Sequence, residues 1–297
     1  MVGKTVEVMN GPKRSSPRIE AYKAFWKRLS KNKAAVVGGF FILLFIVVSI
    51  VGPFLTTKDP TEVMMLNKLQ PPSAEFWFGT DNFGRDIFTR IIHGMGLTLK
   101  VGFLSVAIGG SIGVVFGIVS GYYGGKIDTI IMRVMDVLLA FPGILLALAI
   151  VSVLGGSLQN VIIAVAIFSV PAFARIVRSS TLSVRQLEYI DAVRALGASD
   201  FRIIFKHILP NVVSPIIVQA TLRIATAVLT ASGLSFLGLG AQPPEPEWGA
   251  MLNDGRTYMK TAPHLMLFPG MMIAIVVLAF NIFGDGLRDA LDPKMKK

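Results

Sequence analysis

Residues 34–55 read AAVVGGFFILLFIVVSIVGPFL, and this unbroken apolar run decides the class of fold. A helix rises about 1.5 Å per residue, so a run of this length extends over roughly 33 Å, enough to cross the ~30 Å hydrocarbon core of a bilayer. The preceding segment, residues 1–33, is basic and ends in Lys31 and Lys33. Both the basic segment and the apolar run are longer than those of a signal peptide. The stretch therefore predicts a retained membrane-spanning helix.

Five further apolar stretches follow, at residues 97–120, 129–153, 158–174, 212–240 and 264–284. Each is a continuous run rather than a ten-residue alternation of apolar and polar residues, which favours helices over the strands of a membrane barrel. Hydrophobic residues make up 53% of the chain and charged residues only 16%, against about 25% charged residues in soluble proteins. We therefore expect an all-α polytopic membrane protein with six transmembrane helices.

The distribution of basic residues predicts the orientation of the chain in the membrane. Twenty of the 29 Lys and Arg residues lie in segments 1–33, 121–128, 175–211 and 285–297, and seven lie in segments 56–100 and 241–263. Because cytoplasmic loops carry an excess of Lys and Arg, we expect the first group and both termini inside the cell. The net charge of +11 is then a topology signal rather than a sign of nucleic-acid binding.

These assignments divide the chain into five parts. They are a cytoplasmic basic tail (1–33), a first transmembrane helix (34–55), an extracytoplasmic loop (56–96), a five-helix core (97–284) and a cytoplasmic tail (285–297).

Aromatic side chains in the polar loops expected outside the cell include Phe76, Trp77, Phe78 and Trp248. They are either anchors at the level of the lipid headgroups or contacts to a partner protein, and we expect anchors.

Four glycines line one face of the second expected span, because Gly109, Gly113, Gly117 and Gly121 are each four residues apart. A helix face without side chains lets another backbone approach closely. The neighbouring helix belongs either to a partner subunit or to this chain, and we favour packing within the chain.

Charged residues inside the expected spans are candidates for a transport pathway. Arg133 and Asp136 are three residues apart on one helix face, so we expect them to pair, either as an interfacial anchor or as an element of the pathway. Arg223 lies deep in the fifth span. It is either a pathway residue or a charge that snorkels to the headgroups or pairs within the bundle.

The long cytoplasmic loop between the fourth and fifth spans has two helical patterns. The first has apolar residues at helical spacing up to Gly197, which is a natural helix end. The second begins with Ser199 or Asp200 as a cap and runs to Pro210. Its expected apolar face consists of Phe201, Ile204, Phe205 and Ile208. Such a helix either docks in a groove of another protein or lies on the bilayer surface.

No pattern for catalysis or for metal binding is present in the sequence. There is no cysteine, and the three histidines are not at ligand spacing from one another. The fragments at residues 3–5 and 125–126 lack the glycine-rich loop that binds the phosphates of ATP. The lone Asp136 and the scattered histidines do not supply the convergent groups of a membrane-embedded enzyme. We therefore expect neither a cofactor nor a metal on this chain.

The loop also resembles a known family motif. Residues 191–197, DAVRALG, followed by nine residues and then HILP at 207–210, are similar to the EAA loop of ABC importer permeases. Asp191, Val193 and His207 depart from the residues of the family pattern, while its spacing is kept. Further segments resemble the C-type subunits of the peptide and nickel branch: FGTDNFGRD (78–86), AFPG (140–143), SFLGLGAQPP (235–244), WGAM (248–251) and GDGLRDALDP (284–293).

The resemblance implies a permease in the inner membrane of a bacterium that works with several partners. These are a homologous second permease, two ATPase subunits that bind ATP and Mg, and an extracytoplasmic peptide-binding protein. The family's EAA loop, here at 188–210, couples the permease to the ATPases. On this chain the coupling residues would be Asp191, Ala192, Ala195, Leu196, Gly197, Ala198, Phe201 and Arg202.

Within this branch we expect short peptides as the transported substrate, with glutathione or a nickel chelate as the alternatives. A self-sufficient secondary transporter is the remaining alternative. It would need its own ion site or inverted repeats, and the sequence shows no paired carboxylates inside the spans and no clear repeat.

Overall fold

The computed structural model describes residues 17–291, and the side chains of residues 23–291. The expected tails 1–33 and 285–297 therefore lie partly outside the described residues. The helices are α1 (Pro17–Lys31), α2 (Lys33–Leu55), α3 (Ile87–Tyr123), α4 (Gly125–Leu139), α5 (Gly143–Leu154), α6 (Leu158–Arg185), α7 (Glu188–Ala195), α8 (Asp200–Ile203), α9 (Leu209–Phe236), α10 (Trp248–Gly255) and α11 (His264–Leu291). Short 3₁₀ turns lie at Met65–Asn67 and Arg256–Tyr258, and a π-helical segment at Ile204–Ile208.

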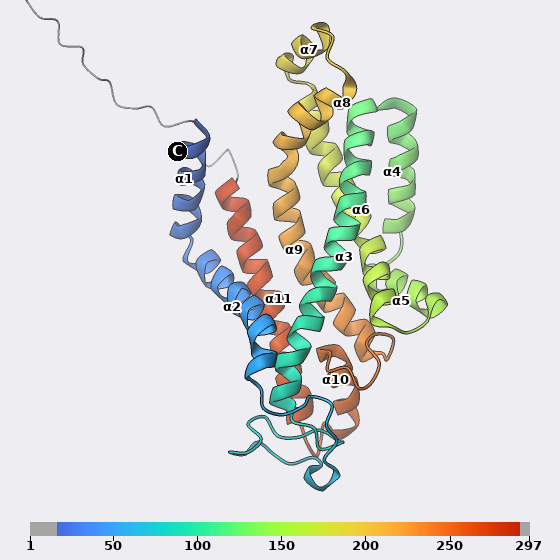
Figure 1. The fold of residues 1–297 in the computed structure, drawn as a ribbon. Coiled ribbons are helices and arrows are strands. Elements are labelled where there is room, and N and C mark those ends of the chain that lie inside the picture. Colours follow the sequence, from blue (N-terminus) through green and yellow to red (C-terminus); the bar gives the residue numbers. More distant parts are fainter. Residues whose placement is uncertain (1–16, 292–297) are drawn as a thin grey trace, which may run out of the picture.

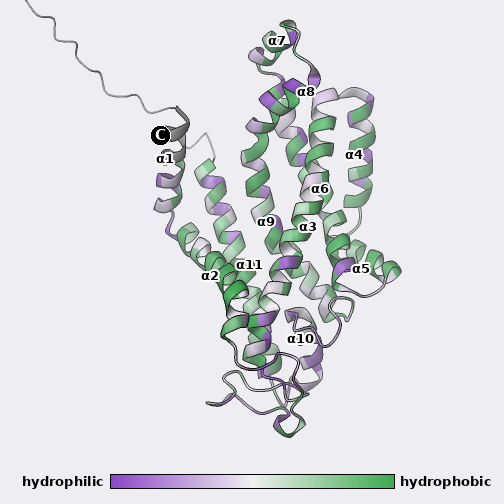
Figure 2. Cartoon of the chain, viewed as in Figure 1, coloured by the Kyte–Doolittle hydropathy of each residue, from purple (hydrophilic) through white to green (hydrophobic). Residues whose placement is uncertain are grey.

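The helices are arranged as a bundle with two different ends (Figure 1). α3 packs against α6 and α9, while α11 packs against α9 and α2. The α7–α8 loop protrudes at one end, and the irregular segment before α3 lies at the other, near α10 (Figure 1). Apolar residues dominate the long helices between these ends (Figure 2).

The prediction of an all-α membrane protein is confirmed. Among the described residues, five helices are long and apolar enough to cross a membrane, and α4 with α5 form a sixth, bent candidate. No strand occurs among residues 17–291, apart from an isolated bridge between Thr80 and Asp86.

The third expected span, 129–153, is not a single straight helix. α4 and α5 meet at an angle of 88° across residues 140–142. Pro142 cannot donate a backbone hydrogen bond and disfavours a helical conformation at Phe141, so the chain turns there. The length of the apolar stretch did not reveal this bend, because apolar residues continue on both sides of Pro142.

The second expected span begins ten residues earlier than the sequence indicated. α3 starts at Ile87, with Asp86 as its cap: the Asp86 carboxylate accepts hydrogen bonds from the backbone N–H and the hydroxyl of Thr89. Its first turns carry Arg90, which is only 2% exposed. The polar start of α3 is therefore buried by the chain itself and is not part of a free loop.

A network of largely buried charges holds the segment that precedes α3 against the start of this helix. The Nε of Arg85 lies 2.6 Å from Oδ2 of Asp81. The Nη2 of the same arginine lies 3.4 Å from Oδ2 of Asp254 in α10. Arg90 donates to the carbonyls of Pro60 and Pro244. Burial raises the pKa of the Asp254 carboxyl, and the nearby Arg85 opposes this shift. Paired in this way, the buried charges lock the segment in one position.

Two of the four aromatic residues expected as headgroup anchors lie instead in the interior. Trp248 is fully buried and donates its Nε1–H to the carbonyl of Ile91 at 3.1 Å, and Phe76 is 1% exposed. Phe78 stacks on Phe268 with 4.1 Å between ring centroids, while Trp77 remains 63% exposed. The anchor prediction is wrong for Trp248 and Phe76, because long-range contacts build a core that the polar loop sequence does not show.

The glycine face of α3 lies against α6 of the same chain. A Cβ at Gly113 would come within 2.6 Å of Val170 O and Phe173 Cβ, and one at Gly117 within 2.7 Å of Ala174 O and Val177 Cβ. Gly109 and Gly121 face α6 at equally short range. The two backbones are therefore in direct contact, as is typical of small-residue faces in membrane helices.

Gly117→Ala should lower the thermal stability of the protein by an amount corresponding to about 1–3 kcal/mol, because the new methyl group must push α3 away from α6. The measurement is the apparent melting temperature of the purified full chain in detergent. Gly96→Ala is the matched control, since its Cβ in the same helix would lie 3.7 Å from the nearest atom. Equal stability of the two variants would contradict a close α3–α6 contact.

Candidate functional site

The protruding loop consists of α7 and α8, which are joined at Gly197. α7 ends at Ala195, and the N–H groups of Gly197 and Ala198 then donate to the carbonyls of Arg194 and Val193. Gly197 has φ +82°, although no atom lies within 4 Å of where its Cβ would be. Glycine is thus favoured here by the left-handed backbone and not by lack of space. The predicted helix end at Gly197 and the cap at Ser199 are both present.

The second part of the loop is not a separate helix. α8, the π-helical segment and α9 form one continuous helical stretch, Asp200–Phe236, which runs into the membrane region. The π-helical turn precedes Pro210, which has no N–H group for the regular hydrogen-bond ladder. Any displacement of α8 is therefore transmitted directly to α9.

The loop is firmly packed on the ends of the transmembrane helices. Ile190, Ile203 and Ile208 are fully buried in a cluster with Tyr122 at the end of α3. The Tyr122 hydroxyl donates to the Asp200 carboxylate at 2.6 Å. The loop and the end of α3 thus form one unit.

The outer surface of the loop is unusually apolar. Leu196 is 87% exposed, and Phe201 and Phe205 are 70% and 54% exposed, with their rings 4.3 Å apart. The expected common face of Phe201, Ile204, Phe205 and Ile208 is therefore divided in two. Ile208 points inward together with Ile203, while the two phenylalanines point outward, because the π-helical turn changes the helical spacing.

The eight candidate coupling residues are at the surface of this loop. Seven are exposed and Ala198 is half-buried; the exposed seven are Asp191, Ala192, Ala195, Leu196, Gly197, Phe201 and Arg202. Two of them, Leu196 and Phe201, are exposed apolar residues, as is the neighbouring Phe205. We call Leu196, Phe201 and Phe205 the apolar patch.

A second group of polar residues lies between α4 and α6. Asp136 pairs with Arg175 of α6 at 2.7 Å, and not with Arg133, so the expected Arg133–Asp136 pair is wrong. Packing of α4 on α6 through Met135, Val170 and Ala174 decides the partner. Sequence spacing could not reveal it, because Arg175 is distant in the chain.

The Asp136–Arg175 pair is exposed and belongs to a longer row of polar side chains. Both members have more than half of their side-chain surface exposed. The exposed polar residues at helical spacing are Lys126, Thr129, Arg133 and Asp136 on α4 and Arg175, Ser179 and Ser183 on α6. We call this set the polar track. An exposed charge pair facing hydrocarbon is costly, which favours a watery or protein environment for the track.

A different face of α4 is apolar and exposed. It carries Ile127, Ile130, Val134 and Val137, which repeat at helical spacing. α4 therefore separates a surface suited to lipid from the polar track.

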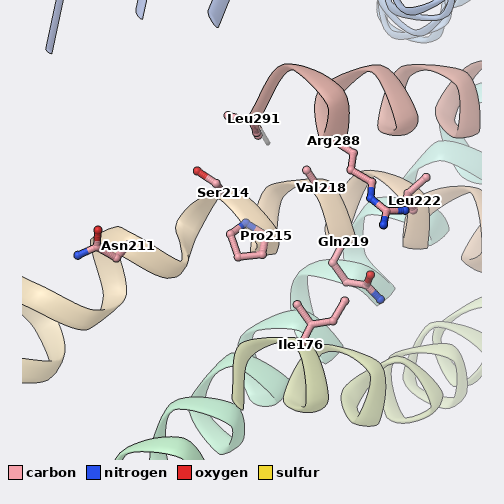
Figure 3. A pocket seen from close by; sticks show the side chains of 9 residues that line it. All are labelled: Ile176, Asn211, Ser214, Pro215, Val218, Gln219, Leu222, Arg288 and Leu291. Carbon is pink, nitrogen blue, oxygen red and sulfur yellow. The ribbon is translucent and has the colours of Figure 1, made fainter. Parts of the chain in front are cut away.

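Arg223 has no hydrogen bond or ion pair with any of the described residues. It lies half-buried in α9, next to Leu222, which lines a cavity of about 510 Å³ between α6, α9 and α11 (Figure 3). The Arg288 side chain extends from α11 toward α9 at this cavity (Figure 3). Gln219, Asn211 and Ser214 add polar groups to its wall. The cavity thus lies where α9 and α11 could move relative to each other.

Neither site has the groups that a resident cofactor requires. Within the part of the chain that the structure describes, no cluster of three His, Asp or Glu side chains could hold a metal ion.

Comparison with known protein families identifies two matching regions. Residues 113–297 match the model described as binding-protein-dependent transport system inner membrane component. Residues 21–72 match the N-terminal transmembrane domain of oligopeptide transport permease C.

Individual relatives are similar over almost their whole length. The dipeptide transport system permease protein DppC of Alkalihalophilus pseudofirmus is 55% identical over 278 residues, covering 94% of this chain and 91% of the relative. The glutathione transport system permease protein GsiD of Pectobacterium atrosepticum is 51% identical, covering 93% and 92%. A solved inward-facing structure of the MetNI methionine ABC transporter aligns with a TM-score of 0.57 at 21% identity, over 69% of this chain and 98% of that one. This last similarity shows the fold.

The polar track should be accessible to water, whereas the apolar face of α4 should not. The chain has no cysteine, so single substitutions can be labelled without background. In the intact complex, Ser179→Cys should react rapidly with a membrane-impermeant maleimide applied to inverted vesicles. Ile130→Cys, at a similar distance from its helix end, should react at least about tenfold more slowly because lipid or protein covers it. Equal labelling of the two positions, or none at Ser179→Cys, would argue against a water-facing track.

Proposed function

Because this chain belongs to the family of binding-protein-dependent transport system inner membrane components, we propose that it forms part of the path by which an ABC importer moves short peptides across the inner membrane. The chain is a permease subunit, and ATP is hydrolysed on separate subunits. The observation that carries the coupling role is the exposed apolar patch on a loop that is rigidly joined to α3 and α9.

The apolar patch is suited to a groove on an ATPase subunit. The rings of Phe201 and Phe205, tilted by 36° to each other, present a compact apolar surface, and the exposed Arg202 and Asp191 of the same loop supply charges for orientation. Burial of such aromatic side chains is a common source of binding energy at interfaces. The coupling residues of the EAA loop, from Asp191 to Arg202, are therefore assigned to this contact.

Transmission from the patch to the membrane follows from the continuous helix. When ATP and Mg close the ATPases, a shift of α8 moves α9 as a rigid body, because Ile203 and Ile208 tie the two together. The Tyr122–Asp200 hydrogen bond passes part of the same movement to α3. Rigid-body movements of packed helices of this kind are the usual basis of alternating access.

The polar track is assigned to the transport pathway, together with Arg223. The Asp136–Arg175 pair offers an anion and a cation side by side, which complements the ammonium and carboxylate ends of a short peptide. Arg223 lacks a partner among the described residues, so its charge is available to a solute or to a second permease. The glycine face, Gly109 to Gly121, holds α3 on α6 and has a structural role beside this path.

The same proposal gives the partners of this chain and its orientation in the membrane. The partners are a homologous second permease, two ATPase subunits and an extracytoplasmic peptide-binding protein, and both termini are cytoplasmic, as the excess of Lys and Arg favours. The opposite end, with its locked charge network, then faces the binding protein.

Short peptides are the proposed cargo because the dipeptide permease shares 55% identity with this chain. Glutathione is the second candidate, favoured by the 51% identity to the glutathione permease. Because glutathione is itself a tripeptide, the two proposals share most of their recognition chemistry.

The test of the function is the rate of ATP hydrolysis by the complex that co-purifies with the tagged chain from native membranes. Binding protein loaded with mixed short peptides should stimulate hydrolysis several-fold over unloaded binding protein. Stimulation only by glutathione or by a nickel chelate would move the assignment to that cargo. Failure of any ATPase to co-purify would contradict the coupled importer and favour a self-sufficient transporter.

Phe201→Ser combined with Phe205→Ser should uncouple the complex. Removing two neighbouring aromatic side chains from an interface should weaken ATPase binding by at least about 2 kcal/mol, or roughly 30-fold. The measurement is the amount of ATPase retained by the purified permease, together with peptide uptake. Leu66→Ser is the control, because Leu66 is 99% exposed at the opposite end. Normal ATPase retention by the double variant would argue against docking at this patch.

A further inference from the structure

A second cavity lies beside the first transmembrane helix, away from the coupling loop and the polar track. It has a volume of about 490 Å³ and is lined by the end of α1 and the last turns of α11. Figure 1 shows these two elements side by side. The lining side chains that matter are Lys27, Arg28 and Lys31 of α1 and Asp289 of α11. The volume lies in the range of ordinary small-molecule sites.

The cavity has a strong excess of positive charge. Three cations face a single carboxylate, and none of the three cationic side chains has a hydrogen bond or ion pair with any residue that the structure describes. Lys27 and Lys31, four residues apart, and Arg28 and Lys31, three apart, are neighbours on the surface of α1, and like charges at this spacing are unfavourable unless an anion lies between them. The arrangement therefore points to an anionic ligand.

Its depth relative to the membrane follows from α2. The Asn32 side chain caps α2 by accepting a hydrogen bond from Ala35 N, and the apolar run begins immediately after Lys33. Lys31 precedes the first apolar residue, Ala34, by three residues and Lys27 precedes it by seven, or about 5 and 10 Å along a helix. The headgroup layer is roughly 5–8 Å thick on each side of the hydrocarbon, so Lys31 lies within it and Lys27 at its outer edge.

Close packing of α1 and α2 on α11 fixes the wall of the cavity. Leu29 and Ala35 are buried in a cluster with Leu287 and Ala290 of α11. Gly286 lies so close to Ala35 that a side chain at position 286 would collide with it. The basic side chains are thus held at a defined separation from α11.

α2, which begins next to the cavity after Asn32, exposes apolar side chains on its outer surface. Val36, Val37 and Phe40 of α2 are 50–61% exposed, one to three turns below the basic residues. A ligand with a phosphate in the cavity could lay an acyl chain along this surface. A soluble anion would leave it unused.

We propose that this cavity binds the phosphate group of an anionic phospholipid, with Lys27, Arg28 and Lys31 as its cationic partners. Basic pockets next to membrane helices on the cytoplasmic side are suited to such headgroups. This function goes beyond transport itself, since it fixes the position of α1 and α2 relative to α11 in the bilayer. It does not depend on the identity of the cargo.

The experiment is native mass spectrometry of the detergent-solubilised complex, titrated with cardiolipin or with phosphatidylcholine. The full chain should retain cardiolipin in preference to phosphatidylcholine. Lys27→Gln with Lys31→Gln should weaken cardiolipin binding about 30-fold, since each removed charge contributes roughly a factor of five. Lys27→Arg with Lys31→Arg should bind normally, because the charges remain. Lys23→Gln with Lys126→Gln, at two exposed lysines outside the cavity, is the control with equal loss of charge.

Three results would overturn the proposal. One is unchanged cardiolipin binding by the Lys27→Gln, Lys31→Gln variant, and another is equal binding of phosphatidylcholine by the unmodified complex. The third is displacement of cardiolipin by inorganic phosphate at similar concentration, which would assign the cavity to a free phosphate. Loss of binding in the Lys27→Gln, Lys31→Gln variant with retention in the other two would support it, whatever solute the importer carries.

Discussion

Direct backbone contact between α3 and α6 is the constraint on which the rest of the structure depends. Helices in lipid gain little from hydrophobic burial, so close van der Waals packing has to hold them together. The glycines from Gly109 to Gly121 make this packing possible over about three turns. Because α3 and α6 are fixed to each other, the loop that follows α6 can pack on Tyr122 at the end of α3.

One end of the bundle contains ion-paired charges, and the other end exposes apolar side chains. At the end near α10, the buried Arg85, Arg90 and Asp81 form ion pairs with one another and with the half-buried Asp254, which fixes the segment before α3 to the bundle. Unpaired, such buried charges would cost several kcal/mol each, so the network has to form as a whole. At the other end, the apolar side chains of Leu196, Phe201 and Phe205 remain uncovered. The exposed apolar side chains of the α7–α8 loop, together with the fixed charge network at the other end, fit the proposal that a partner protein acts on this subunit through that loop.

The sequence predicted the features that depend on interactions between neighbouring residues. It did not predict several features that depend on contacts between distant segments or on irregular helix geometry. The apolar runs, the helix end at Gly197 and the cap at Ser199 each depend on a few neighbouring residues, and all are present. The bend at Pro142 was missed because apolar residues continue on both sides of it, and the stretch has the length of a single span. The inward direction of Ile208, which was expected on the same face as Phe201 and Phe205, was missed because the π-helical turn shifts the spacing from that of the regular helix. The burial of Trp248 was missed because its contact, Ile91, is more than 150 residues away.

By itself the sequence determined that the chain is a helical membrane protein, and its EAA-like loop indicated the family. Length, apolar composition and motif spacing are properties of the chain alone, and the bilayer admits few ways of satisfying the backbone. Only the tertiary structure decided which charges meet. Asp136 could pair with Arg133 by spacing, but the packing of Met135 on α6 brings it to Arg175. Ion-pair partners, buried networks and lined cavities depend on distances between segments far apart in the chain, which no local pattern contains.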